Sequence, residues 1–147
     1  MFSMFVSMFA PHPVSADQIS VRSLTLQAHG PTTDGGSKRS GVVDHEFAFT
    51  VPNVGAPAIG SIEFKYCTLA AGICTMPAGL HTDTFGSGTT MGTQTGATGF
   101  TLVNTTNGAP YITRTAASIS AGSALTYEIL GVTNPDATDC PLNNPSP

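Results

Sequence analysis

The sequence predicts an all-β protein, an Ig-like antiparallel β-sandwich of about seven strands, and three observations support this prediction. Apolar and polar residues alternate along several short segments, and this period of two is typical of a half-buried strand. Turn-forming residues separate these segments at intervals of about 8 to 15 residues, as in known sandwiches. No amphipathic helical pattern follows the first ten residues.

Length and composition agree with a single exported β-domain. The chain has 147 residues, enough for one domain with a sizeable core. Only 10% of its residues are charged, against about 25% in an average soluble domain. The five basic residues are scattered, so the clustered basic face of a nucleic-acid-binding protein is not expected. No segment reaches the length of about 20 apolar residues that a membrane span requires.

The N-terminal segment is apolar and resembles a secretory signal. Residues 1–10 (MFSMFVSMFA) are apolar except for Ser3 and Ser7, and a Pro-His-Pro sequence follows them. Val14-Ser15-Ala16 then offers the small residues that a signal peptidase recognises, although nothing basic precedes the apolar run. We therefore expect residues 1–16 to be either a cleaved signal or a retained assembly segment. Residues 17–147 are expected to form a single β-sandwich domain.

The alternating segments predict where the strands lie. Ile62, Phe64 and Tyr66 alternate with polar residues, and we expect the strand that leads to Cys67 to be the central one. Gly86–Gly99 has no periodicity and is expected to be a loop, and the chain after Leu130 a loop and tail. The other predicted strands are Ile19–Gln27, Val43–Val51, Phe100–Thr105, Tyr111–Thr115 and Leu125–Leu130, with a short extended piece at Leu80–Phe85 and a hairpin turn at Asn107-Gly108.

Three cysteines in a chain with a signal-like start favour one disulfide and one further thiol. Cys67 and Cys74 are the natural pair, because a reversal of the six residues between them brings their Cα atoms within bonding distance. Cys140, in a tail rich in Asp, Asn and Pro, is expected to be free or bonded between chains. A zinc site is not expected, because the short Cys-x-x-Cys spacing that zinc prefers is absent.

No residue is predicted to be catalytic, and no metal ion or cofactor is predicted. His45 shares a strand face with apolar residues and is expected to be a half-buried histidine. His81 and Asp83 lie two apart and therefore on one face, but no nucleophile motif accompanies them. The sequence Asp34-Gly35-Gly36 and the pair Asp136 and Asp139 do not match a calcium-loop spacing and are first of all turn residues.

Several short motifs occur in an order that resembles a family of proteins. They are IGSIEFKYC, CTMPAGL, GATGFTL, ITRT and GVTNP, from Ile59 to Pro135. In this order they are similar to secreted β-sandwich surface or fibre proteins of ultra-small candidate-phyla (Patescibacteria-type) bacteria, a largely uncharacterised group. The resemblance implies a secreted, surface-exposed or fibre-forming protein. Members of that group usually continue into a further strand, whereas this chain ends in the loop after Asn-Pro.

We expect the protein to be a non-catalytic structural subunit of an extracellular fibre or surface layer. Its main partner is then itself, and strand addition between subunits could complete the sandwich at an unpaired edge after Leu125, Tyr127 and Ile129. Phe2, Phe5 and Phe9 of a retained N-terminus are the candidate assembly residues. The alternative is an adhesin that binds carbohydrate or a host or neighbouring cell surface through loops such as 86–99, although the absence of Trp argues against sugar stacking.

Overall fold

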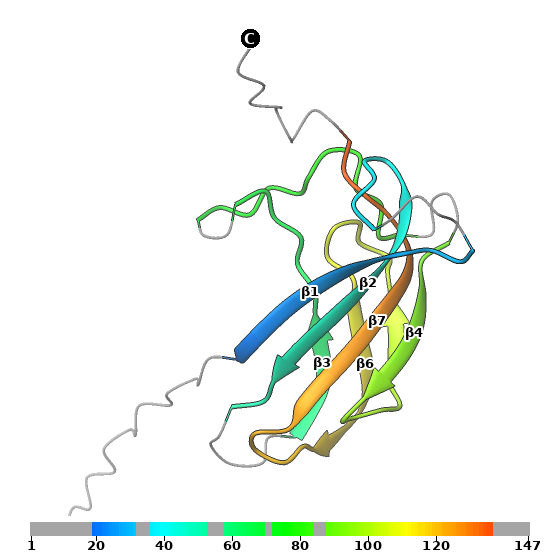
Figure 1. The fold of residues 1–147 in the computed structure, drawn as a ribbon. Helices are drawn as coiled ribbons and strands as arrows, with labels where there is room; N and C mark the ends of the chain where they lie inside the picture. Colours follow the sequence, from blue (N-terminus) through cyan, green and yellow to red (C-terminus); the bar gives the residue numbers. More distant parts are fainter. Residues whose placement is uncertain (1–18, 32–35, 53–57, 70–71, 84–87, 137–147) are drawn as a thin grey trace, which may run out of the picture.

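The computed structural model describes residues 19–31, 36–52, 58–69, 72–83 and 88–136. Within these ranges the chain is all-β and forms seven strands and no helix (Figure 1). Accordingly, nothing in the described part of the chain is a long apolar helix of the kind that crosses a membrane. The strands are β1 (Ser20–Ala28), β2 (Val42–Thr50), β3 (Ala58–Glu63), β4 (Thr90–Thr95), β5 (Thr101–Val103), β6 (Tyr111–Ser118) and β7 (Ala124–Thr133).

The strands form two antiparallel sheets of unequal width. The larger sheet has the order β1-β2-β7-β4, and the smaller sheet has the order β3-β6-β5. Figure 1 shows the larger sheet laid over β3 and β6. The prediction of an all-β, two-sheet protein is therefore confirmed. The larger sheet has four strands and the smaller sheet has three. This difference determines where the inner face of the larger sheet is left uncovered.

Tyr127 on β7 lies at the centre of the core between the sheets. Its side chain is fully buried, and its ring centroid lies 6.0 Å from that of Phe49, 6.4 Å from Phe64 and 5.4 Å from Phe100. Its hydroxyl donates a hydrogen bond of 3.1 Å to the carbonyl oxygen of Ala97. One side chain thus joins segments of both sheets and satisfies its single polar atom in the interior.

The segment Gly86–Gly99, predicted to be a loop, contains β4, and this prediction was wrong. Its small residues permit close approach to β7, because a Cβ added at Gly92 would lie 2.6 Å from Oε2 of Glu128 and 3.0 Å from Leu130. The backbone N–H of Thr93 also donates a hydrogen bond of 3.1 Å to Oε2 of Glu128. Threonine favours strands, but the sequence TMGTQT has a single apolar side chain, that of Met91, so no apolar alternation reveals the strand.

The segment predicted to be the central strand is instead an edge strand of the smaller sheet. Regular pairing of β3 with β6 ends at Glu63. The N–H groups of Phe64 and Tyr66 still donate hydrogen bonds of 2.9 Å to the carbonyl oxygens of Pro110 and Gly108, so the chain continues in the antiparallel pattern. Alternation correctly predicted the buried position of Phe64. It reports which face of a strand is covered, and it contains no information about the strand's place in the sheet.

The central strand of the larger sheet is β7, which pairs with both β2 and β4. It is longer than predicted, because it continues through the buried Gly131 and Val132 to Thr133. The expected unpaired edge after Leu125, Tyr127 and Ile129 therefore does not exist. The burial of β7 alternates as far as Ile129, but Gly131 and Val132 are both buried, and the Gly and Asn-Pro residues after Leu130 were interpreted as a loop.

The hairpin signal at Asn107-Gly108 correctly identified the connection between β5 and β6. The pairing of Val103 with Tyr111 closes the hairpin, with a loop over residues 104–110. Gly108 has a φ of 76°, in the left-handed region that glycine tolerates, and an added Cβ would lie 2.5 Å from Met76. Asn107 Nδ2 donates to the Leu80 carbonyl oxygen at 2.8 Å, which ties this loop to the chain before β4.

The predicted disulfide between Cys67 and Cys74 is present in the structure, with a Cα–Cα distance of 4.9 Å. The N–H of Thr68 donates a hydrogen bond of 2.9 Å to the carbonyl oxygen of Thr75, so the bridge closes a reversal that is also held by the backbone. Cys140 lies outside the described residues.

Two isoleucines test the core assignment. Ile129 on β7 is fully buried, whereas Ile73 in the disulfide loop is 88% exposed. We expect Ile129→Ala to lower the free energy of unfolding by about 2–5 kcal/mol, the usual result of leaving a cavity in a core. The matched variant Ile73→Ala should change it by less than about 0.5 kcal/mol. Urea unfolding measures both, and equal losses at the two sites would contradict the assignment.

Removal of the disulfide should destabilise the fold. Replacing both Cys67 and Cys74 by serine frees a short loop in the unfolded chain, and the expected loss is about 2–3 kcal/mol. Cys140→Ser should leave the free energy of unfolding unchanged. Non-reducing peptide mapping provides a separate check, and a linkage between Cys67 and Cys140 would show that the bridge is wrongly assigned.

Candidate assembly surface

The inner face of β1 carries apolar side chains that the smaller sheet does not cover. Leu24 pairs with Phe47, and Leu26 pairs with His45, so each leucine shares a sheet face with its partner. That face points to the core, because the Phe47 ring lies 4.3 Å from the Phe64 ring of the opposite layer. Leu24 is nevertheless 47% exposed and Leu26 is 39% exposed. β1 therefore projects beyond the edge of the smaller sheet.

The nearest strand of the smaller sheet, β3, pairs with β6 on one side and with no strand on its other side among the described residues. Figure 1 shows β3 behind β2 and β7, while β1 lies to the outside of β2. N–H groups along a strand point alternately to its two edges. Because those of Phe64 and Tyr66 point to the β6 side, those of Glu63 and Lys65 point to the free edge.

Two adjoining hollows of about 310 and 300 Å³ lie between β1 and this free edge. Both are lined by Ile19, Phe49, Ile62 and Glu63. Phe47, Phe64 and Lys65 line the first as well, and Val51 and Ile59 line the second. We call these two hollows, together with the exposed Leu24 and Leu26 on the adjoining inner face of β1, the β1–β3 groove; neither leucine lines a hollow itself, but Phe47, the ladder partner of Leu24, lines the first. Its walls are mainly aliphatic and aromatic, and its charged residues are Arg22, Glu63 and Lys65.

A bulge interrupts β1 where it borders this groove. Ser20 pairs with Thr50 and Ser23 with Ala48, so two residues of β1 oppose one of β2. Val21, within the bulge, has a φ of 48° and is 80% exposed. A β-branched residue rarely adopts this conformation, because its Cβ substituents crowd the backbone. The bulge holds a strained apolar residue in solvent beside Ile19, which is itself 40% exposed.

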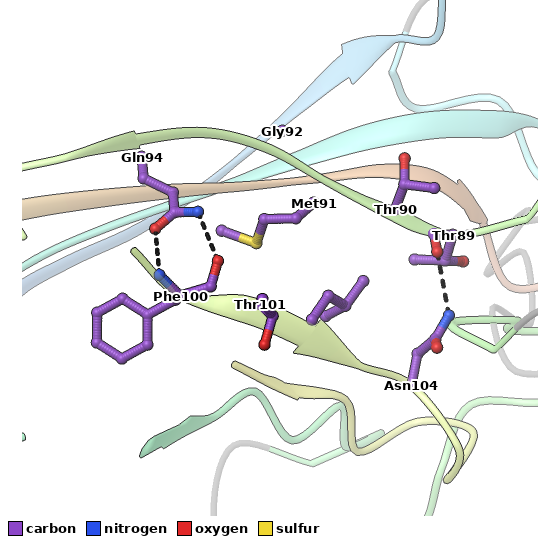
Figure 2. A pocket seen from close by; sticks show the side chains of 9 residues that line it. Thr89, Thr90, Met91, Gly92, Gln94, Phe100, Thr101 and Asn104 are labelled. Carbon is purple, nitrogen blue, oxygen red and sulfur yellow. Dashed lines mark hydrogen bonds between the residues drawn. The ribbon is translucent and has the colours of Figure 1, made fainter. Parts of the chain in front are cut away.

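The opposite side of the sandwich, between β4 and β5, is bridged by side-chain amides. Gln94 Nε2 donates to the Phe100 carbonyl oxygen at 2.8 Å, and the Phe100 N–H donates to Gln94 Oε1 at 3.0 Å. Asn104 Nδ2 donates to the Thr89 carbonyl oxygen at 3.1 Å. Figure 2 shows these contacts spanning a cleft of about 400 Å³ that also contains Met91. The two edge strands on this side are thus connected to each other.

His45 is buried rather than half-buried, in a hydrogen-bonded cluster between the layers. Its Nδ1 lies 2.8 Å from the Tyr66 hydroxyl and its Nε2 lies 3.4 Å from Oδ1 of Asn134. Asn134 Nδ2 donates to the carbonyl oxygens of Gly36 and Lys38, both at 2.9 Å, and this orients its oxygen towards His45. The tautomer that fits carries hydrogen on Nε2 and accepts the Tyr66 proton at Nδ1.

Burial lowers the pKa of His45, while the Asn134 hydrogen bond and the charge of Asp44 oppose that effect. Burial also raises the pKa of Tyr66. The neutral forms of both side chains are therefore favoured in the folded protein. Asp44 is buried next to His45 because a bulge separates Val43 from His45 in the ladder with β7. Both ring nitrogens of His45 thus lie against protein groups, and the environment is that of a structural histidine.

Asp44 does not hydrogen-bond His45. Its Oδ1 accepts a hydrogen bond of 2.9 Å from the Gly131 N–H and lies 2.7 Å from Nδ1 of His29. The carboxylate thus joins the end of β1 to β7. The sequence did not indicate that His29 is a partner of Asp44.

The other predicted candidates are not assembled into a chemical site in the described residues. His81 Nδ1 lies 3.6 Å from Asp83 Oδ1, longer than a hydrogen bond, and the buried Thr82 between them accepts the Gly108 N–H at 2.8 Å. Within the described ranges, no three His, Cys, Asp or Glu side chains are placed to hold a metal ion. Residues 34, 35 and 139, considered for calcium, lie outside these ranges, as do the candidate assembly residues Phe2, Phe5 and Phe9.

Comparison of the chain with protein-family models, curated proteins and solved structures found no match. The description of the protein therefore rests on its own fold. That fold is a disulfide-containing, all-β protein whose larger sheet overhangs the smaller one.

The groove residues of β1 were not recognised from the sequence as a candidate site. Leu24 and Leu26 are two residues apart, which shows that they share a face, and the same alternation predicted the strand itself. The pattern predicts that such a face is covered, whereas here it is left open. Only the distribution of the strands between the two layers reveals this, and the sequence did not predict that distribution.

Burial of His45 predicts a specific loss of stability in acid. The unfolded chain binds a proton with a pKa near 6.5, whereas the folded protein resists protonation until lower pH. Stability should therefore be constant above that pH and fall as pH drops below it, with a slope of at most about 1.4 kcal/mol per pH unit. Urea unfolding between about pH 7.5 and about pH 5.5 covers this window. His45→Gln should flatten the dependence, and an unchanged slope would show that other groups cause it.

Proposed function

We propose that the protein is a secreted, non-catalytic structural subunit that assembles with copies of itself into an extracellular fibre or surface layer. The building unit in this proposal is an Ig-like sandwich. The β1–β3 groove is the observation that carries the proposal, because it combines an uncovered apolar face with the free edge of a strand. Each of these features favours association, and together they specify a strand as the missing partner.

The free edge of β3 is only partly protected against pairing: a register shift interrupts it between Ile59 and Ser61 and Lys65 follows it, but it has no proline. The free edges of monomeric proteins usually carry lysine, proline or inward-pointing charges that prevent pairing with other chains. β3 has the sequence AIGSIE, which contains a single charge at its last residue and no proline. An edge of this composition, beside the exposed Leu24 and Leu26, is suited to pairing. The opposite side of the sandwich differs, because amides join β4 to β5 there.

Export is supported by the disulfide and the composition. Disulfides persist in oxidising compartments and are rare in the cytosol, and Cys67 and Cys74 form one here. The low content of charged residues agrees with that location. The similarity of motifs noted above points in the same direction, and it is the weakest of these supports.

The structure gives less support to the adhesin alternative. The cleft between β4 and β5 is partly lined by hydroxyl and amide side chains of the kind that bind sugars, yet its Gln94 and Asn104 amides already bond to the backbone across it. The aromatic ring in its lining, Phe100, is 3% exposed and stacks with Arg114 at 4.4 Å. Sugar-binding sites usually present an open aromatic face, so we rank this function second.

Assembly of the full chain should depend on the inner face of β1. We expect the protein to form oligomers or filaments as its concentration rises, measured by sedimentation velocity and by negative-stain electron microscopy. Leu24→Asp places a charge in the groove and should prevent assembly. It should not unfold the subunit, since Leu24 is already half-exposed.

Thr25→Lys is the control for an added charge, because Thr25 is the next residue, is exposed, points to the other face of β1 and has Glu46 as its ladder partner. It should assemble as the unmodified chain does. A full chain that stays monomeric at every concentration would contradict the proposed function. A protein that instead binds a panel of glycans while remaining monomeric would favour the adhesin.

A further inference from the structure

We propose that the occupant of the β1–β3 groove is the segment Met1–Ala10 of a second copy, added as a strand to the free edge of β3. This inference rests on the proposed function and identifies the partner surface that the assembly would use.

The groove defines three requirements for its occupant. It must present an extended backbone, because the Glu63 and Lys65 N–H groups point to the free edge. It must carry apolar side chains at alternate positions, because one face of the added strand would lie against Leu24, Phe47 and Ile62. It must also avoid charge at the positions that lie against these three side chains, because an ionised group there would lose its hydration among apolar atoms.

The segment Met1–Ala10 meets these requirements. In an extended strand its even-numbered positions share one face, and they are the apolar residues Phe2, Met4, Val6, Met8 and Ala10. Its odd-numbered positions include Ser3 and Ser7, which suit the outer, hydrated face. The segment has no ionisable side chain and no proline, and its length is comparable with the extended stretch Ala58–Tyr66. Of the predicted assembly residues, Phe2 then faces the groove, while Phe5 and Phe9 face outwards.

The other terminal segment is unsuitable as the occupant. Residues 137–147 contain Pro141, Pro145 and Pro147 and the charged Asp139. Proline has no N–H to donate to a ladder and is excluded from most strand positions. This segment therefore cannot supply both a continuous hydrogen-bonding edge and an apolar face.

A second copy is favoured over insertion of the segment into its own groove. Ile19 lines the groove, so the chain's own segment would have to reverse direction within residues 11–18 (PHPVSADQ). Pro11 and Pro13 disfavour the helical conformation at the residues before them, Ala10 and His12, which keeps the start of the connection extended. The reversal would then be left to the five residues Val14–Gln18. Such a connection favours extension away from the subunit, towards another one.

The contact is heterologous, because the donated segment and the groove are different surfaces of the chain. Each subunit gives one strand and receives one, and repetition of such a contact builds an open fibre unless the rotation between subunits closes a ring. Main-chain hydrogen bonds would supply affinity, and the alternate side chains would set the register.

Two neighbouring substitutions in the full chain test the donor strand. Val6→Asp places a charge on the face that enters the groove, whereas Ser7→Asp places the same charge on the outer face. We expect Val6→Asp to abolish filaments in electron microscopy and to leave a folded monomer by sedimentation, and Ser7→Asp to assemble normally. A segment that associates merely by being apolar would be impaired equally by both substitutions.

Mixing two defective proteins tests whether the strand passes between copies. Val6→Asp keeps an intact groove, and Leu24→Asp keeps an intact donor segment. Each alone should be monomeric, and an equimolar mixture should form a dimer that cannot extend, because the only intact contact joins one copy of each. Val6→Asp labelled at its N-terminus, which the mixed dimer does not use, with a fluorophore makes the dimer visible in sedimentation.

The outcomes separate this inference from the proposed function. Filaments that form from Val6→Asp as readily as from the unmodified chain would overturn the N-terminal donor and leave a fibre subunit in place. A mixture that remains monomeric would overturn exchange between copies, as would mass spectrometry showing that native fibres contain a chain beginning after residue 16. An unmodified full chain that never assembles would remove the proposed function itself.

Discussion

The inner face of an apolar sheet must be covered, and in this protein four strands face a layer of only three. The consequences appear at the two ends of the layers. Between β4 and β5, the sheets are connected by the amides of Gln94 and Asn104. Between β1 and β3 no comparable contact is present among the described residues, and Leu24 and Leu26 remain exposed on a face whose other members are core residues. The uneven number of strands thus concentrates the open apolar surface at one side.

The rest of the core does not depend on that side. Tyr127 contacts aromatic rings from both layers, and its hydroxyl is bonded to the Ala97 carbonyl oxygen in the interior. The His45, Tyr66 and Asn134 cluster joins the layers near the end of β7 through a second set of buried polar contacts. A fold with these two anchors can remain intact while one of its sides is open. A subunit of the proposed assembly would need this property before its partner binds.

Much of the fold could be predicted from the sequence, because burial on one face imposes an alternation that is visible in the residues. The strands that contain Phe47, Phe64 and Tyr127 were found in this way, and the short loop between two cysteines indicated the disulfide. β4 was missed because Met91 is the one large apolar side chain in Thr90–Thr95, so no apolar period records its position. The order of strands in each sheet was also inaccessible, since alternation describes faces and not neighbours.

The candidate site was predicted only in outline for the same reason. An unpaired edge and strand addition were expected, yet the edge was placed after Leu125–Ile129, which turned out to be the interior of the larger sheet. The edge that is free belongs to β3, the segment expected to be central. The residues that make the groove, such as Leu24 and Ile62, have ordinary strand patterns. Their exposure follows from the arrangement of distant segments, which local sequence does not encode.

Amide hydrogen exchange along β3 tests the central claim most directly. Ile62 lies in the ladder with β6, and the Phe64 N–H donates a hydrogen bond to the Pro110 carbonyl oxygen. The Glu63 and Lys65 N–H groups, in contrast, point to the free edge. If a neighbouring subunit adds a strand there, the Glu63 and Lys65 amides should exchange quickly in the monomer and slowly in the assembled protein. The Phe64 amide should be slow in both states. Equally fast exchange of Glu63 and Lys65 before and after assembly would contradict the account, because it would show that subunits meet at another surface.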